Sequence, residues 1–475
     1  MAAATTELTS ELTSALTEVL GASHVTGLEQ LSGGASRETW AFDAEVGGGA
    51  RRLILQRERP GGLRESGMGV EAALLAAAAA AGVPVPTVLA CDDGAGEGRL
   101  GAAYLVVERL EGESIARRIL RAEALAPARA GLAGQCGAAL AGIHAIDPAS
   151  VPGLEDTDQV VRYRQVLDDL GQPHPVFELA FRWLADNRPA GGGRTVVHGD
   201  FRNGNLLVDT DGLVAVLDWE LAHIGDPMED LGWLCVRSWR FGAAPRVGGF
   251  GTVDDLVTAY EAASGTTVDR AALHWWELLG TLKWGIMCVA QAETHRLGIA
   301  RSVELAAIGR RVCEVEHDVL LLLPSAHERP PVHERPPVHE RPPVHEGGTH
   351  EGGSHEGGTH PRGPHDVPTA AELVEAVREF LTGDVMAATE GRVRFHARVA
   401  ANVLATVARE LELGPEQADA HAARVAALGV ADDAELALRI RTGGLDERWV
   451  EVTAAVQASV AAKLAVANPT YADEG

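Results

Sequence analysis

The sequence predicts an α+β chain of two lobes, followed by a linker and a separate all-α C-terminal bundle. Strand-like alternation is concentrated in residues 25–110, and helical periodicity dominates residues 111–323. A repetitive tract rich in His, Pro and Gly then occupies residues 324–366. From residue 367 to residue 475 the pattern is again nearly all helical. We therefore predict one two-lobed domain over residues 1–323 and a helical domain over 367–475.

The first lobe is predicted to be a small sheet that carries one helix. Two strands are expected to pair across the turn VGGGA, a helix begins near Val70, and AAYLVVERL returns as a strand. The leucines at positions 8, 12, 16 and 20 recur every four residues, which predicts a docking helix at the N-terminus. The predicted strands are residues 38–46, 51–57 and 102–110.

The second lobe is predicted to be helical, with a short β-hairpin at one edge. Helical patterns cover residues 124–146 and 158–189 and resume up to residue 323. Between them the apolar runs TVVH, LLV and LVAVLDW read as short strands. After the linker, Phe395 opens an apolar stripe that recurs every four residues as far as Leu411, which predicts an amphipathic helix of the bundle.

Composition limits the classes of partner. The formal net charge is -26, which repels phosphate backbones and anionic lipid, so we expect neither nucleic-acid nor membrane-surface binding. The five cysteines are scattered without a C-x-x-C pair, so no disulfide framework is expected and a reduced, cytoplasmic location fits best. The linker holds eight of the 18 histidines, and we read it as a repeat-expanded spacer rather than a closed metal site.

The stretch HGDFRNGN carries the chemistry. His198, Asp200 and Asn205 stand in the spacing H-x-D-x-x-x-x-N, and Asp218 follows at the end of the strand LVAVLDW. An aspartate that accepts a hydroxyl proton, with an amide and a second carboxylate that hold Mg²⁺ against nucleotide phosphates, suffices for phosphoryl transfer. A plain turn followed by a helix-capping aspartate is the alternative, and the agreement of spacing, strand context and GDPMEDL favours the catalytic interpretation.

The run VHGDFRNGNLLVDTDGLVAVLDWELAHIGDPMEDLGW closely resembles the aminoglycoside phosphotransferase and choline kinase-like superfamily, in particular its acyl-CoA dehydrogenase-associated branch. The resemblance covers about residues 25–323 and implies a bilobal protein kinase-like fold that uses ATP or GTP with Mg²⁺. It implies that Asp200 is the catalytic base, that His198 organises the loop, and that Asn205 and Asp218 are the metal ligands. By the same analogy Asp226 and Asp230 are structural. Residues 367–475 resemble an uncharacterised helical domain appended to such enzymes.

The resemblance also implies a nucleotide site in the first lobe. The turn LSGGASRETW is similar to the family's phosphate-covering turn, in which Gly33, Gly34 and Ser36 approach the phosphates. Glu71 matches the acidic helix residue that holds the strand cation in kinases. The strand YLVVERLEG matches the hinge between lobes, so the backbone from Glu108 to Leu110 is expected to contact the nucleobase.

The strand LILQRERPG departs from the family because it lacks the lysine that kinases place there. The chain has only two lysines, Lys283 and Lys463. Strand alternation points Gln56 at the nucleotide and Arg57 to the other face. A bulge near Pro60 or the length of its side chain would let Arg57 reach the phosphates, and we predict that Arg57 replaces the lysine with Glu71 as its partner.

The acceptor site is expected within residues 235–301, where four tryptophans and four cations occur, although tryptophans at helical spacing more often form core. Cations suit the phosphates of a CoA thioester, whereas polycationic antibiotics require carboxylates. We therefore predict a small-molecule kinase whose acceptor is a hydroxyacyl-CoA or related metabolite. Two alternatives are an aminoglycoside or choline-like alcohol kinase and a nucleotide-binding regulatory module with weak or no catalysis. The residues concerned are Trp239, Trp275, Trp276, Trp284, Arg237, Arg240, Arg296 and Lys283.

Overall fold

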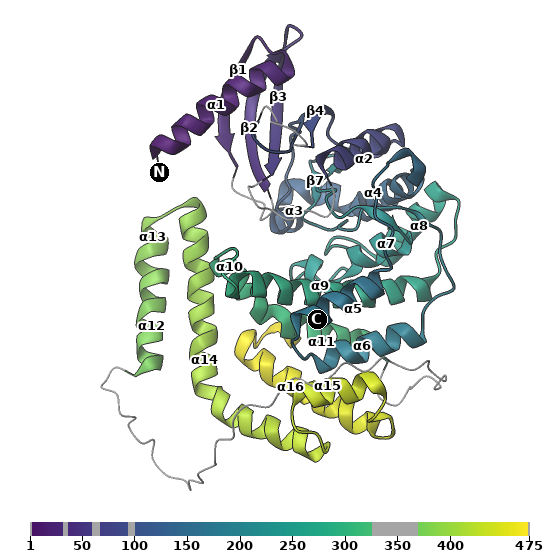
Figure 1. The fold of residues 1–475 in the computed structure, drawn as a ribbon, viewed down its shortest axis with the longest axis vertical. Helices are drawn as coiled ribbons and strands as arrows, with labels where there is room; N and C mark the ends of the chain where they lie inside the picture. Colours follow the sequence, from purple (N-terminus) through teal and green to yellow (C-terminus); the bar gives the residue numbers. More distant parts are fainter. Residues whose placement is uncertain (1, 32–36, 59–66, 94–99, 325–368, 474–475) are drawn as a thin grey trace.

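The computed structural model describes residues 2–31, 37–58, 67–93, 100–324 and 369–473 (Figure 1). Gly33, Gly34 and Ser36, which are predicted to approach the nucleotide phosphates, lie outside the described residues. Nearly all of the linker does so as well. The described part has a small sheet at one end, a larger helical body, and a C-terminal helical segment beside that body (Figure 1).

The first lobe is a five-stranded antiparallel sheet in the order β1-β2-β3-β5-β4. One face packs Leu53 and Leu55 of β3 against Leu12 and Leu16 of helix α1, which confirms the docking helix. Because side chains alternate along a strand, Ile54 and Gln56 point to the opposite face, where helix α2 lies. The elements are α1 (Ala2–Leu20), β1 (His24–Gln30), β2 (Arg37–Val46), β3 (Gly49–Glu58), α2 (Met68–Ala80), β4 (Val88–Asp92) and β5 (Tyr104–Glu108).

The second lobe is helical and contains two pairs of short strands. The predicted hairpin is formed by β7 (Leu206–Val208) and β8 (Leu213–Val216). Strand β6 (Thr195–Val197) pairs with β9 (His223–Gly225), a strand that the sequence pattern did not predict. The principal helices are α3 (Ala116–Arg121), α4 (Ala126–His144), α5 (Gln159–Leu170), α6 (Pro175–Asp186), α7 (Met228–Cys235), α8 (Val253–Ser264), α9 (Arg270–Arg296), α10 (Val303–Ile308) and α11 (Val312–Leu322).

The C-terminal segment is all helical, as predicted, and it packs on the second lobe. Helices α15 and α16 lie against α6 and α11, and their apolar side chains belong to the same buried cluster as those of the lobe. Arg441 and Lys463 form ion pairs with Asp168 (2.9 Å) and Glu316 (3.0 Å) of the lobe. The helices are α12 (Ala370–Phe380), α13 (Met386–Ala388), α14 (Gly391–Ala427), α15 (Asp433–Thr442) and α16 (Trp449–Ala467).

The apolar stripe predicted on α14 is not its buried face. Phe395 and Leu411, at the ends of the stripe, are 50% and 47% exposed and the valines between them are half-buried, whereas Ala397 and Ala401 are buried. Small side chains allow close approach of a neighbouring helix, and α12 packs along α14 as an antiparallel partner (Figure 1). The periodicity therefore located the helix correctly and its contact face incorrectly.

Among the described residues, one helical stretch, Asp446–Ala467, is long and apolar enough to cross a membrane by length and composition. Its side chains Val452, Val456 and Val460 are buried in the cluster shared with the second lobe.

Candidate active site

The loop after β6 is held by a buried aspartate on α7. Asp230 accepts the backbone N–H groups of His198 (2.8 Å) and Gly199 (2.9 Å), and the His144 ring contacts it at 3.1 Å. Burial by itself raises the pKa of Asp230, but the hydrogen bond and charge of His144 hold it below its usual value. Gly199 has a φ of 76°, and a Cβ there would meet the Leu221 carbonyl oxygen at 2.3 Å. The structural role expected for Asp230 is confirmed.

The Asp200 carboxylate is oriented by three side-chain donors. The indole N–H of Trp233 donates to Oδ1 (2.9 Å), and the Asn205 amide donates to Oδ2 (2.6 Å). The Arg202 Nε–H lies within 2.9 and 3.1 Å of the two oxygens. Donors of this kind fix the direction of the carboxylate, as a general base requires. Trp233 and Arg202 were not among the predicted site residues.

His198 connects the loop to the strand that precedes Asp218. Its ring is fully buried, Nδ1 accepts the backbone N–H of Asp200 (3.2 Å), and Nε2 donates to the Leu217 carbonyl oxygen (3.1 Å). The ring also packs on Trp219 at 4.7 Å between centroids. Burial lowers the pKa of His198, so the ring is neutral near neutral pH. Both ring nitrogens are committed to loop structure, which fits the organising role expected for this residue.

Asp218 and Asn205 offer oxygen atoms at the same edge. Asp218 follows β8 with a φ of 65°, and burial and then the Glu220 charge raise its pKa to about 7. Asn205 directs its amide nitrogen to Asp200, which leaves its carbonyl oxygen for another partner. Carboxylate and amide oxygens are ligands that Mg²⁺ accepts, usually together with substrate phosphates. No cluster of three or more His, Cys, Asp or Glu side chains suited to a metal occurs in the described part of the chain.

In the first lobe Glu71 holds an arginine, but not the predicted one. Arg57 donates to the Leu100 carbonyl oxygen (2.8 Å) and pairs with Glu38 (3.1 Å). It lies on the face of β3 that carries Leu53 and Leu55, because alternation was not broken by a bulge within β3. The predicted pairing of Arg57 with Glu71 is therefore wrong. The partner of Glu71 is Arg37, at the start of β2.

Comparison with known proteins identifies the family. Residues 27–276, more than half of the 475-residue chain, match the phosphotransferase enzyme family. The chain belongs to that family. Residues 387–471 match a domain of unknown function, DUF6285, which agrees with the predicted appended helical domain.

Relatives of this phosphotransferase carry dehydrogenase names. It is 30% identical over 235 residues to the Arabidopsis thaliana protein named probable acyl-CoA dehydrogenase IBR3, covering 44% of this chain and 28% of that protein. It is 31% identical over 215 residues to acyl-CoA dehydrogenase family member 10 of Mus musculus, covering 42% and 20%. The chain therefore spans about a quarter of the length of these relatives.

A crystal structure from Ralstonia eutropha, assigned to the aminoglycoside phosphotransferases, shares the fold of this phosphotransferase. It superposes with a TM-score of 0.53 at 19% identity and covers 66% of this chain and 97% of its own. At this identity the likeness shows the fold alone. The bilobal kinase-like architecture is thereby confirmed.

The predicted hinge of the phosphotransferase lies at the end of β5. The Glu108 N–H bonds to the Thr87 carbonyl oxygen (2.9 Å), and the Arg109 N–H bonds to that of Arg52 (2.8 Å). The backbone donors of Glu108 and Arg109 are thus occupied by the sheet. Of the three predicted residues, Leu110 keeps the N–H with no backbone partner in the described part. Contact of the backbone from Glu108 to Leu110 with a nucleobase, through this N–H or through a carbonyl oxygen, stays a prediction.

The cations predicted to line the acceptor site are bound to internal partners. Arg237 pairs with Asp318 (3.3 Å) and Arg240 with Glu277 (3.2 Å). Lys283 is buried against Glu229, and the exposed Arg296 pairs with Glu293 on its own helix. The expectation that these cations face an acceptor phosphate is not met, because buried carboxylates far away in the sequence neutralise three of them.

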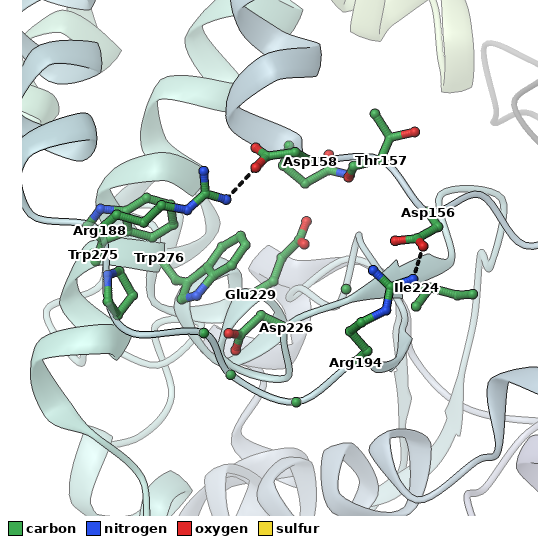
Figure 2. Close-up of a pocket in the computed structure, with 16 residues that line it drawn as sticks. Asp156, Thr157, Asp158, Arg188, Arg194, Ile224, Asp226, Glu229, Trp275 and Trp276 are labelled. Carbon is green, nitrogen blue, oxygen red and sulfur yellow. Dashed lines mark hydrogen bonds and ion pairs between the residues drawn. The ribbon is translucent and has the colours of Figure 1, made fainter. Parts of the chain in front are cut away.

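The four tryptophans divide into two pairs. Trp239 and Trp284 contact each other at 4.8 Å, and Arg202 stacks over Trp239 at 4.7 Å, beside Asp200. Trp275 and Trp276 instead line a separate hollow of about 230 Å³ (Figure 2). This hollow lies about two helical turns from Trp284, roughly 12 Å along α9. Its rim carries the ion pairs Arg188–Asp158 and Arg194–Asp156 (Figure 2).

Proposed function

We propose that this phosphotransferase transfers the γ-phosphoryl group of ATP to a hydroxyl group of a small molecule in an Mg²⁺-dependent reaction. The observation that carries the proposal is the Asp200 carboxylate, fixed by donors from Trp233, Arg202 and Asn205 next to Asp218. A base, an amide and a second carboxylate in this arrangement are the parts that phosphoryl transfer to an alcohol requires.

In this mechanism Asp200 orients the acceptor hydroxyl and accepts its proton as the oxygen forms its bond to the γ-phosphorus. The bond between that phosphorus and the bridging oxygen breaks, and ADP leaves with the electron pair. Asn205 and Asp218 would hold Mg²⁺, which neutralises charge on the phosphates when bound. Lys283 and Asp230 fix the loop on which Asp200 stands.

For the acceptor we propose a hydroxyacyl-CoA or a related hydroxylated metabolite. Support comes from the relatives named acyl-CoA dehydrogenases, which match 44% and 42% of this chain. Arg237, Arg240 and Lys283 pair with internal carboxylates, so they do not support the choice of a CoA thioester through its phosphates. Arg202, which is partly exposed, pairs with Asp200 and stacks over the buried Trp239, so it places a cation beside the proposed base where the acceptor would bind.

The experiment is a transfer assay with γ-labelled ATP and three acceptor classes, namely a 3-hydroxyacyl-CoA, choline and an aminoglycoside. We expect Mg²⁺-dependent label on the hydroxyacyl-CoA with the wild type and none with Asp200→Asn. Label on choline or the aminoglycoside alone would retain the kinase and replace its acceptor. Tight Mg·ATP binding without transfer to a wide acceptor panel would indicate a regulatory nucleotide-binding module, and absence of ATP binding would refute the proposal.

A further inference from the structure

The sheet of the first lobe presents a buried guanidinium at the face where the nucleotide is proposed to bind. Arg37 is 5% exposed, and its two terminal nitrogens contact the two oxygens of Glu71 at 3.0 and 2.8 Å. The same guanidinium donates to the Gln56 side-chain oxygen at 2.6 Å. Glu71 therefore holds a cation from β2, one strand away from the position at which kinases carry their lysine.

Strand register explains why β2 can supply this cation. Thr39 pairs with Gln56 across the ladder, and Arg37 pairs with Glu58. Directly paired residues point to the same face of a sheet, so Arg37 emerges beside Gln56 and on the side of α2. Gln56 is uncharged, and its amide oxygen accepts from the guanidinium. Cations at both positions would place two like charges in contact, so this arrangement favours a single cation, either on β2 or on β3.

The guanidinium also reaches the second lobe. Arg37 Nη2 lies 3.1 Å from Glu220, two residues after the proposed metal ligand Asp218. In addition, Arg37 Nε–H is buried with no hydrogen-bond partner within the described residues. A buried donor without a partner is costly, so a phosphate oxygen at this edge would offer the guanidinium an acceptor that the described residues do not supply.

We propose that Arg37 binds the nucleotide phosphates in place of the absent strand β3 lysine, with Glu71 and Gln56 as positioning residues. This inference rests on the proposed kinase function. An arginine fork can contact a carboxylate and a phosphate oxygen at once, which suits a residue already held by Glu71. The cation has thus moved to β2 while its position in space relative to α2 is retained.

The test is calorimetric binding of Mg·ATP and of adenosine to the full-length protein, because only ATP carries the phosphates. Arg37→Gln is expected to weaken ATP binding by about ten- to hundredfold, the loss typical of a charge-assisted hydrogen bond, and to leave adenosine binding unchanged. Arg57→Gln is the matched control on the opposite face and should bind both ligands as the wild type does. Melting temperatures of all variants are recorded alongside.

A double substitution that moves the cation from β2 to β3 tests whether a loss of binding in Arg37→Gln results from misfolding. In Arg37→Gln/Gln56→Lys the cation is restored from β3 beside Glu71, and we expect ATP affinity within about fivefold of the wild type. Gln56→Lys alone should weaken ATP binding through repulsion from Arg37. Equal losses for ATP and adenosine in Arg37→Gln, or ATP affinity equal to that of the wild type, would overturn the inference while leaving the kinase proposal in place. Absence of ATP binding by the wild type would instead refute the kinase proposal itself.

Discussion

The Lys283 ammonium group lies 3.0 Å from the carbonyl oxygen of Gly199, directly beneath the residue that precedes the proposed base. It also sits 4.7 Å from the centre of the Trp233 ring, whose N–H holds Asp200. Burial alone lowers the pKa of Lys283, but Tyr163, Glu229 and Asp200 raise it above the usual value, so the group remains a cation. One buried charge thus supports the base through the backbone and through an indole.

Lys283→Met is expected to lower kcat by about tenfold or more with a smaller change in KM, because the loop and the indole lose a common support. Lys463→Met is a matched control: it also leaves a buried carboxylate, Glu316, without its lysine. That variant should lower the melting temperature and leave kcat of the folded enzyme unchanged. Equal kcat values for both variants would show that Lys283 contributes stability only.

Trp233→Phe tests the indole hydrogen bond while most of the buried ring is kept. We expect kcat to fall by about ten- to hundredfold, as for loss of a hydrogen bond to a charged group. Trp276→Phe serves as control, because the Trp276 N–H is buried and lacks a partner among the described residues. Steady-state kinetics of the two variants should therefore differ clearly, and similar kcat values would remove Trp233 from the site.

Asp200→Asn is expected to abolish phosphoryl transfer and to change ATP affinity by no more than a few-fold, since the base acts on the acceptor. The carboxamide keeps the size of the side chain and can still accept from Trp233. Single-turnover transfer and calorimetric ATP binding measure the two effects separately. Turnover near the wild-type rate would exclude Asp200 as the base.

Asp218 is expected to make the magnesium-free protein less stable as the pH rises. Its pKa is about 7 in the folded protein against an ordinary 3.8, so the folded state binds the proton more tightly than the unfolded chain does. The stability linked to this group is fully present below about pH 4 and is lost as the pH rises through about 7. Asp218→Asn cannot titrate, so with EDTA it should exceed the wild type at about pH 8 by on the order of 2 kcal/mol.

Urea unfolding at about pH 5 and about pH 8 measures this difference, which should be smaller at the lower pH. The same substitution should abolish Mg²⁺-dependent ATP binding, so stability and function change in opposite directions. A variant less stable than the wild type at both pH values would contradict the predicted titration.

Deleting residues 327–360 and joining the ends with a Gly/Ser tether should leave the parts on each side folded and turnover intact. A spacer of this composition does not contribute to the packing of either part. Truncation after Leu323 should behave differently, since it exposes the apolar surfaces of α6 and α11 that α15 and α16 cover. We expect that variant to aggregate or to melt at a lower temperature. Thermal denaturation and size-exclusion chromatography compare the two.

The place of the loop that carries the proposed base, between short strands, could be predicted from sequence because its residues lie close together along the chain. His198, Asp200 and Asn205 lie within eight residues, and the strands on each side have clear apolar patterns. Strands β1 and β4 were missed, since β1 exposes most of its side chains and every residue of β4 is half-buried, so neither shows a strong alternation.

The contacts that hold the site residues in place could not be predicted, because they join segments that are distant in the sequence. Arg37 and Glu71 meet only when the register of β2 and β3 is known, and Lys283 reaches Gly199 across 84 residues. The scarcity of lysine did single out Lys283, but its occurrence among arginines and tryptophans in residues 235–301 suggested an acceptor surface instead of a buried support. The apolar stripe on α14 misled for a similar reason, since periodicity does not state which face a neighbouring helix will cover.

The buried apolar cluster that α11 shares with α16 changes how loss-of-function alleles should be interpreted. Because this cluster is continuous, we expect the second lobe and the C-terminal helical segment to unfold together in a single calorimetric transition. Substitutions at positions of this segment such as Val456 would then inactivate the enzyme by unfolding it, far from Asp200. Loss-of-function alleles that map to the C-terminal helical segment would then reflect the cooperativity of folding. A separate biochemical role for this segment would have to be sought in alleles that leave the protein abundant.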